Sequence, residues 1–203
     1  DSRIEFVDHI IYTCDVSKFL DIGGAGSSPN IPIEFRPLGK YISNEIIEQR
    51  GLYIAIDNSS ENIANLKQRH SFNCVNYDDI CHPISLNDQM FSTIYMGLCL
   101  QYLDNVNAAL QNSIKHLTSG GSIIIEVPNV YYLRDLMMVF RRGQNLLSED
   151  LNNKMLCDHS ILLKLCAKHG LEVVSTFYIK GPKCLNLTPY RFSEFIALKA
   201  VVA

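Results

Sequence analysis

Three short segments of this sequence have residue types and spacing that suit a nucleoside-containing ligand. In the first, residues 19–27 read FLDIGGAGS, an apolar run followed by small residues. Glycine allows the backbone to approach a ligand closely, and the N-terminus of a following helix offers free N–H groups. Because any tight turn between a strand and a helix also favours glycine, this segment alone does not identify a ligand.

The other two segments supply carboxylates. Asp57 ends the apolar run LYIAID, where a carboxylate can accept hydrogen bonds from both ribose hydroxyls, although a turn or helix N-cap has the same pattern. Asp78 and Asp79 follow a further apolar run, and a carboxylate there can accept a hydrogen bond from an adenine amino group; solvated loop acids look the same. Together the three segments indicate a ligand that contains a nucleoside.

These residues require a framework in which several strands end at one edge. Strand patterns cover residues 18–22, 52–57, 72–76, 93–96, 122–127, 171–179 and 193–202. Helix patterns cover residues 2–15, 41–50, 60–70, 104–117, 130–142 and 159–169. Their alternation predicts an α/β fold with a doubly wound, largely parallel sheet. The loop before the last strand leaves no room for a crossover helix, so the final two strands are expected to pair antiparallel.

Composition limits the function further. With 203 residues, of which 47% are hydrophobic, the chain has the size of a single domain covering residues 1–203. Its net charge of −3 disfavours nucleic acid as a partner. No apolar run approaches the roughly 20 residues that span a membrane. Seven scattered cysteines predict a reducing, cytoplasmic setting. No metal is predicted, because the residues in the Cys81-His82 and Cys157-Asp158-His159 groups are closer together in sequence than is usual for zinc ligands.

The ordered segments resemble the class I S-adenosylmethionine-dependent methyltransferases over roughly residues 2–180. FLDIGGAG is similar to the first glycine motif of that family, and LYIAIDNSSENIANLKQR to its second-strand acid and following helix. FSTIYMGLCLQYLDN resembles the fourth-strand segment, and LTSGGSIIIEVPN the turn and fifth strand. The resemblance implies a Rossmann-like seven-stranded sheet of order 3-2-1-4-5-7-6 with the last strand antiparallel, and S-adenosyl-L-methionine as cofactor.

The resemblance also implies roles for residues around the cofactor. Residues on its methionine and ribose side would be Asp21, Gly23, Gly24 and Gly26. Asp57 would bind the ribose hydroxyls, and Asp78, with Asp79 as its near rival, the adenine amino group. Met96 and Gly97 would flank the cofactor after the fourth strand.

The sequence departs from the family pattern in three places. The glycine triplet reads GGAGS, so its middle and last glycines are displaced or lost. The stretch before Asp57 is longer than the roughly 20 residues of a dinucleotide fingerprint. We expect residues 31–50 to form a lid or insert over the site. Tyr102 stands where a His is frequent, which argues against a His base at that point.

The methyl acceptor should bind after the fourth and fifth strands. His159 and Tyr102 are the candidate catalytic residues, with His159 as the base for an acceptor that loses a proton. Tyr131, Tyr132 and Arg134 are the candidate substrate-binding residues. Core packing is the alternative for the tyrosines, and a helix N-cap position is the alternative for His159.

The sequence therefore predicts a methyltransferase that acts on a small molecule or sugar, with O-methylation favoured. A catalytically inactive methyltransferase-fold domain used for binding or interaction is the alternative. A nicotinamide-dependent oxidoreductase would need G-x-G-x-x-G at the first turn with an acid about 20 residues on, and neither is present.

Overall fold

The computed structural model describes most of the segments on which these predictions depend. The described residues are 6, 9–10, 12–24, 51–69, 75–84, 86, 88–132, 155, 157–179, 193 and 195–202. Gly26, Arg134, the predicted 31–50 insert and the predicted helix over 41–50 lie outside them, as does most of the helix predicted over 130–142.

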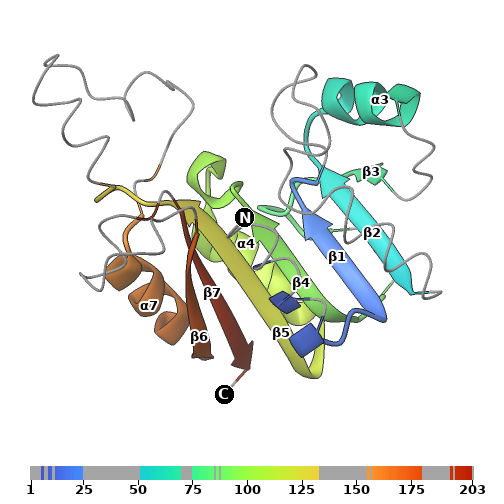
Figure 1. Ribbon diagram of the computed structural model, residues 1–203. Helices are drawn as coiled ribbons and strands as arrows, with labels where there is room; N and C mark the ends of the chain where they lie inside the picture. Colours follow the sequence, from blue (N-terminus) through green and yellow to red (C-terminus); the bar gives the residue numbers. More distant parts are fainter. Residues whose placement is uncertain are drawn as a thin grey trace, which may run out of the picture.

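Seven strands form one sheet. They are β1 (Lys18–Ile22), β2 (Leu52–Asp57), β3 (Val75–Tyr77), β4 (Phe91–Gly97), β5 (Leu117–Pro128), β6 (Leu171–Ile179) and β7 (Phe195–Val202). Their order is β3-β2-β1-β4-β5-β7-β6, which is the order that the family resemblance implies (Figure 1). Strands β1 to β5 are parallel to one another, whereas β7 runs antiparallel to both β5 and β6. The predicted fold class and the antiparallel final pair are confirmed.

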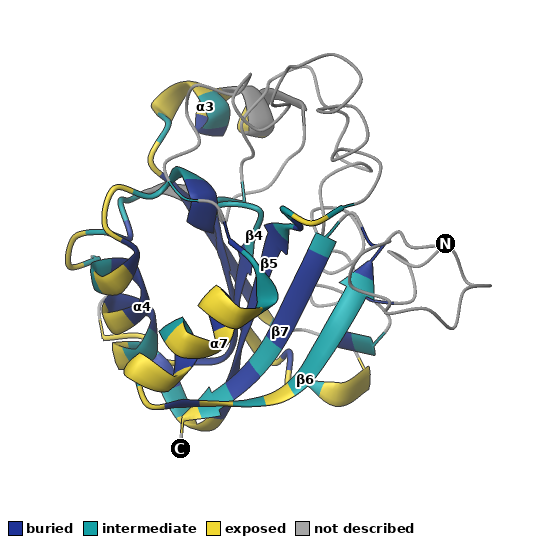
Figure 2. Cartoon of the chain, turned by 90° about the vertical axis from the view of Figure 1, so that its left-hand side faces the viewer, coloured by how far each residue is buried: buried dark blue, intermediate teal, exposed yellow. Residues whose placement is uncertain are grey.

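Helices cover both faces of the sheet. One core joins Leu20, Ile94 and Ile123 of the sheet to Leu110 of α4 (Val106–Lys115) and Leu162 of α7 (His159–Lys168). Figure 2 shows these two helices on the same side of the sheet. The core on the opposite face includes Ile63 of α3 (Ser60–Arg69), together with the helical residues Phe6 and Ile10. Because the central strands are buried on both faces, they carry near-continuous apolar runs.

Several predicted boundaries were wrong, most clearly that of the fifth strand. Strand β5 begins at Leu117 rather than Ser122, because Leu117 pairs with Phe91 before the ladder resumes at Thr93 and Ser122. Gly120, at φ 75°, lies in the irregular stretch between those pairs. The preceding helix consequently ends at Lys115, with His116 as its C-cap. The described part of the third strand ends at Tyr77, one residue later than predicted, and β4 extends beyond the predicted 93–96 at both ends.

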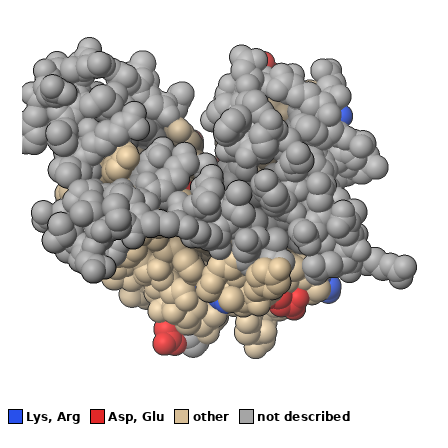
Figure 3. Space-filling model, viewed as in Figure 1, with Lys and Arg blue, Asp and Glu red and all other residues tan. Residues whose placement is uncertain are grey.

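The distribution of positive charge on the described surface agrees with the slightly negative net charge of the sequence. On the face seen in Figure 3, the Lys and Arg atoms of the described residues form isolated spots. Among the helices that the structure describes, none is long and apolar enough to cross a membrane.

Asn112 of α4 fixes the loop that follows β3. Its side chain is 8% exposed, and its Nδ2 atom donates to the carbonyl oxygens of Ile80 and His82 at 2.9 and 2.7 Å. These bonds tie the loop after Asp78 and Asp79 to a helix that is packed on the sheet. The position of both candidate adenine ligands therefore depends on a buried amide far along the chain.

Replacing Asn112 by Ala should destabilise the protein more than replacing its exposed neighbour Gln111 by Ala. The first change leaves two carbonyl oxygens without their donor, which costs about 1–3 kcal/mol of unfolding free energy. The second should cost less than about 0.5 kcal/mol. Urea denaturation measures both, and equal losses would contradict the anchoring role of Asn112.

Candidate functional site

The loops that follow the first three strands are joined to one another by backbone hydrogen bonds. The Gly23 N–H donates to the Ile56 carbonyl oxygen at 2.8 Å, which links the turn after β1 to the end of β2. The Asp78 N–H donates to the Asp57 carbonyl oxygen at 3.0 Å, which links the loop after β3 to the same strand end. The glycine turn, Asp57 and Asp78 therefore lie along one edge of the sheet, as the sequence predicts.

The glycine turn packs so closely on its neighbours that side chains do not fit. Gly23 has φ 76°, and a Cβ atom there would lie 2.8 Å from the Cβ of Cys99. A Cβ on Gly24 would lie 2.8 Å from that of Ala55 and 3.0 Å from the Cγ of Asp21. The turn thus rests on β1, β2 and the segment after β4 at once. Sequence reasoning missed Cys99, whose contact with the turn has no local signature.

The position of Asp57 is compatible with both of the roles that the sequence left open. It ends β2, it is 8% exposed, and its Oδ1 atom accepts from the Ser59 N–H at 2.9 Å. Ser59 in turn accepts from the Asn62 N–H at 3.2 Å and so caps α3. The carboxylate is consequently held in a fixed orientation at the strand end, where a ribose would be bound.

The carboxylates of the two acidic residues after β3 have different hydrogen-bond partners. Asp79 organises its own turn, because its Oδ1 accepts from the Cys81 N–H at 2.9 Å and its Oδ2 lies 3.9 Å from His82 Nε2. The Asp78 carboxylate accepts from the adjacent Asp79 N–H at 2.9 Å, and its own N–H is the group bonded to Asp57. The loop after β3 is thus tied to the end of β2 through the Asp78 backbone, and the role of either acid as a ligand stays a prediction.

The end of β4 is a tight and strained segment. A Cβ on Gly97 would collide with the ring of Tyr95, which occupies the space over the glycine. Leu98 has φ 51°, which is uncommon for a residue with a side chain, and its N–H donates to the Glu126 carbonyl oxygen at 2.9 Å. The side chain of Met96 is fully buried in the core that contains α4 and α7, so only its backbone is available at the site.

The pKa of the Cys99 thiol is affected by two carboxylates. Burial raises the pKa of Cys99 above its usual range, and the negative charges of Asp21 and Asp57 raise it further. Electrostatic effects of this kind need short distances in a medium of low polarity. Cys99 and Asp21 both pack against the glycine turn, and the charges of Asp21 and Asp57 favour the protonated thiol.

Gln101 is a second residue that sequence reasoning did not select. It lies in the short 3-10 helix η2 (Leu100–Tyr102) and is 4% exposed. Its Nε2 donates to the Leu98 carbonyl oxygen at 2.8 Å, and its backbone oxygen accepts from the Met155 N–H at 3.3 Å. Its Oε1 is the one buried side-chain oxygen without a hydrogen-bond partner among the residues that the structure describes. Tyr102 ends the same 3-10 helix and is half-buried.

The predicted acceptor side is assembled from the loop after β5 and the start of α7. Asn129 is buried, and its side chain donates to the Ser193 carbonyl oxygen at 2.8 Å while accepting from the Tyr131 N–H at 3.1 Å. Asp158 accepts from the Ile161 N–H at 2.7 Å, and this bond lowers the pKa of Asp158, to which the Tyr131 side chain contributes as well. Tyr131 and α7 are therefore in contact. Tyr131 is 46% exposed and Tyr132 is half-buried.

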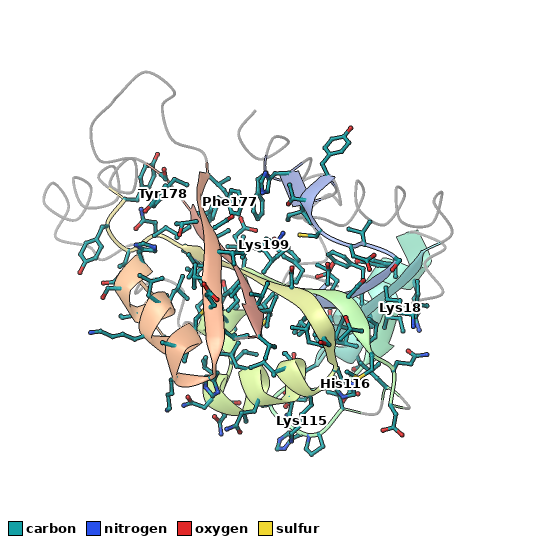
Figure 4. All side chains as sticks on the ribbon, turned by 90° about the horizontal axis from the view of Figure 1, so that it is seen from below. Lys18, Lys115, His116, Phe177, Tyr178 and Lys199 are labelled. Carbon is teal, nitrogen blue, oxygen red and sulfur yellow. The ribbon has the colours of Figure 1, made fainter. Side chains whose placement is uncertain are left out.

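His159 lies at the start of α7, next to strand β6. The N-cap of α7 is Asp158, and His159 is the first residue of the helix. The His159 Nε2 atom lies 3.3 Å from Thr176 Oγ1, and its ring is 6.2 Å from that of Tyr178. Thr176 and Tyr178 belong to β6, the edge strand at the opposite end of the sheet from β2 and β3 (Tyr178 is labelled in Figure 4). Through β7, Tyr178 lies level with Val127 at the carboxyl end of β5, and the catalytic role of His159 stays a prediction.

Comparison with known proteins identifies the fold. Residues 39–125 match the family model of a methyltransferase domain. The chain has the fold of the S-adenosylmethionine-dependent methyltransferases. No curated protein sequence gives a significant match.

Solved structures match this methyltransferase-fold chain over nearly its whole length. A putative methyltransferase from Haloferax volcanii, in complex with the activator Trm112, has TM-score 0.67 and 13% identity, covering 96% of this chain and 88% of that chain. A possible histamine N-methyltransferase from Thermotoga maritima has TM-score 0.64 and 17% identity, with coverage of 100% and 89%. The N-methyltransferase NodS from Bradyrhizobium japonicum, bound to S-adenosylhomocysteine, has TM-score 0.60 and 14% identity, with coverage of 98% and 84%. The family and this complex support S-adenosylmethionine as the cofactor.

Replacing Gly23 by Ala should cost more stability than replacing Gly120 by Ala. Both glycines have positive φ, at 76° and 75°, so both variants lose about 1–2 kcal/mol to backbone strain. Only the Gly23 variant adds a collision with Cys99, because no atom lies within 4 Å of a Cβ on Gly120. We expect an additional loss of about 1–3 kcal/mol in urea denaturation. Equal losses would show that the close contact is absent.

The Asp57→Asn variant should make Cys99 more reactive toward iodoacetamide at pH 8. Removing the negative charge lowers the pKa of Cys99, and the thiolate fraction rises about tenfold for every 1.4 kcal/mol of repulsion that is lost. Alkylation rates are followed by peptide mass spectrometry, and Glu172→Gln on the exposed part of β6 is the charge control. An unchanged rate in Asp57→Asn would contradict the proximity of the two residues.

Proposed function

We propose that the chain is an S-adenosylmethionine-dependent methyltransferase that acts on a small molecule. The observation that carries this proposal is the joined edge of β1, β2 and β3, where backbone bonds place Asp57 and Asp78 beside a glycine turn without room for side chains. A nucleoside cofactor needs these three features together: a close backbone approach, a ribose acceptor and an adenine acceptor.

The residues present fit the cofactor. At Gly23 and Gly24 the backbone packs directly on Cys99, Ala55 and Asp21, and a glycine backbone without side chains would allow a ligand to approach the turn closely. Asp57 would accept from the ribose hydroxyls and Asp78 from the adenine amino group. Asp21, which is buried at the end of β1 below the turn, would face the amino-acid part.

The chain contributes mainly positioning to the reaction. When bound, the cofactor supplies an electrophilic methyl group on a positively charged sulfur. The glycine turn and Asp57 would hold the adenosine and fix the direction from which an acceptor approaches. Orientation of two reactants can contribute about 7–11 kcal/mol to lowering the barrier. The Gly97–Leu98 backbone and Tyr102 would form the wall between cofactor and acceptor, where an aromatic ring favours positive charge.

The acceptor would bind beside Tyr131 and Tyr132, on the loop that Asn129 anchors. A small molecule with a hydroxyl acceptor remains the proposal from the sequence. A hydroxyl needs a base whereas a neutral amine does not, and His159, whose Nε2 lies 3.3 Å from Thr176 Oγ1, is the proposed base. Because two of the similar structures are named as N-methyltransferases, amines should be assayed beside hydroxyl compounds.

Isothermal calorimetry with S-adenosylmethionine and S-adenosylhomocysteine tests the proposal. Wild type should bind both, and Asp57→Asn should bind each about 10–100-fold more weakly, because hydrogen bonds to a charged group contribute about 1.5–3 kcal/mol. The Asn side chain retains an oxygen that can accept from the Ser59 N–H, so folding should survive. Glu172→Gln is the control with the same loss of charge at the far edge of the sheet.

The outcomes separate the candidate functions. Absence of binding by folded wild-type protein would contradict the methyltransferase proposal. Binding without methyl transfer to any hydroxyl or amine tested would favour an inactive binding domain. In that case an activator subunit should be supplied, since the Haloferax volcanii methyltransferase was solved with one.

A further inference from the structure

Tyr53 and Asp21 form a buried pair directly below the glycine turn. The phenol of Tyr53 on β2 donates to Asp21 Oδ2 on β1 at 2.7 Å. The two side chains are 6% and 4% exposed. Asp21 pairs in register with Ala55, so the phenol extends along its strand toward the carboxyl end to reach the carboxylate.

The ring of Tyr53 is held in place independently of this hydrogen bond. It stacks on Phe19, with ring centroids 6.0 Å apart and an interplanar angle of 18°. Phe19 and Tyr53 also face each other in the β1–β2 register. A phenol on a fixed ring is a fixed donor, because its oxygen can move only with the whole ring.

The carboxylate that Tyr53 holds is the one on which the turn rests. A Cβ on Gly24 would lie 3.0 Å from the same Asp21 Oδ2 atom. The two oxygens of a carboxylate have a fixed geometry, so holding Oδ2 also sets the direction of Oδ1. The orientation of Asp21 relative to a ligand on the glycine turn is therefore determined by a residue that lies deeper in the sheet.

We propose that Tyr53 is a positioning residue, which orients the Asp21 carboxylate toward the positively charged amino group of the cofactor. This inference rests on the proposed function and adds a residue to its amino-acid subsite. A carboxylate is complementary to an ammonium group, and a charge-assisted hydrogen bond depends strongly on direction. Loss of the phenol should therefore weaken the amino-acid contact and leave adenosine binding intact.

The test compares two ligands that differ in the amino-acid part alone. S-adenosylhomocysteine carries the amino group, whereas 5′-methylthioadenosine has the same adenosine and thioether without it. Calorimetry on Tyr53→Phe should show the dissociation constant for S-adenosylhomocysteine raised by about tenfold, which corresponds to the loss of one charge-assisted contact. The constant for 5′-methylthioadenosine should change by less than about twofold.

Two further variants show whether Tyr53 acts through Asp21. Asp21→Asn should weaken S-adenosylhomocysteine at least as much as Tyr53→Phe, and the double variant should lose no more than Asp21→Asn alone, because both changes remove the same interaction. Tyr178→Phe on the far strand β6 is the control and should bind both ligands as wild type does. Thermal unfolding confirms that each variant is folded.

The ways in which the proposal can fail are distinguishable. Equal weakening of both ligands in Tyr53→Phe, or additive losses in the double variant, would overturn the positioning role and leave the proposed function standing. Unchanged binding of both ligands would also overturn it. Failure of folded wild-type protein to bind either ligand would overturn the proposed function, and the role of Tyr53 with it.

Discussion

The close packing of the turn after β1 is the constraint on which the site depends. At Gly23 and Gly24 the chain passes so near Cys99, Ala55 and Asp21 that even a methyl group would collide. This contact holds the turn against the ends of β1 and β2 and against the segment after β4. A ligand laid on the turn meets a rigid surface, because the turn cannot sink further into the sheet. The displaced glycines of the sequence motif are consistent with this arrangement, since Gly23 and Gly24 are the positions without space.

The same packing concentrates negative charge. Asp21, Asp57 and Asp78 end or follow three neighbouring strands, and two of them raise the pKa of the intervening Cys99 thiol. Carboxylates so placed are stable when fixed donors solvate them. Each acid here has such a donor, in turn the Tyr53 phenol, the Ser59 N–H and the Asp79 N–H. Each of these donors also orients the carboxylate to which it is bonded. The three oriented carboxylates are therefore complementary to a ligand with many hydroxyl and amino hydrogens.

Local patterns predicted the strands that carry the site, and long-range contacts explain what they missed. Asp57 could be placed at a strand end because the apolar run before it is continuous and buried. Tyr53, Asn112 and Cys99 could not be selected, since each matters through a partner at least 30 residues away or through packing against a distant turn. The start of β5 was missed because the Ser119-Gly-Gly segment has the composition of a turn, although Leu117 pairs before it.

In the proposed function, one half of the sheet binds the cofactor and the other half binds the methyl acceptor. The proposed cofactor groups lie on β1 to β4, where parallel strands end together. The acceptor groups depend on β5, β7 and α7: Asn129 bonds to Ser193 just before β7, and Tyr131 contacts the acid that caps α7. Because these anchors share no residue with the glycine turn, the acceptor side can change its shape without disturbing the Asp21 and Asp57 cluster. A fold built in this way can retain one cofactor while its acceptors vary. For this reason the sequence allows prediction of the residues on the cofactor side but not of those on the acceptor side.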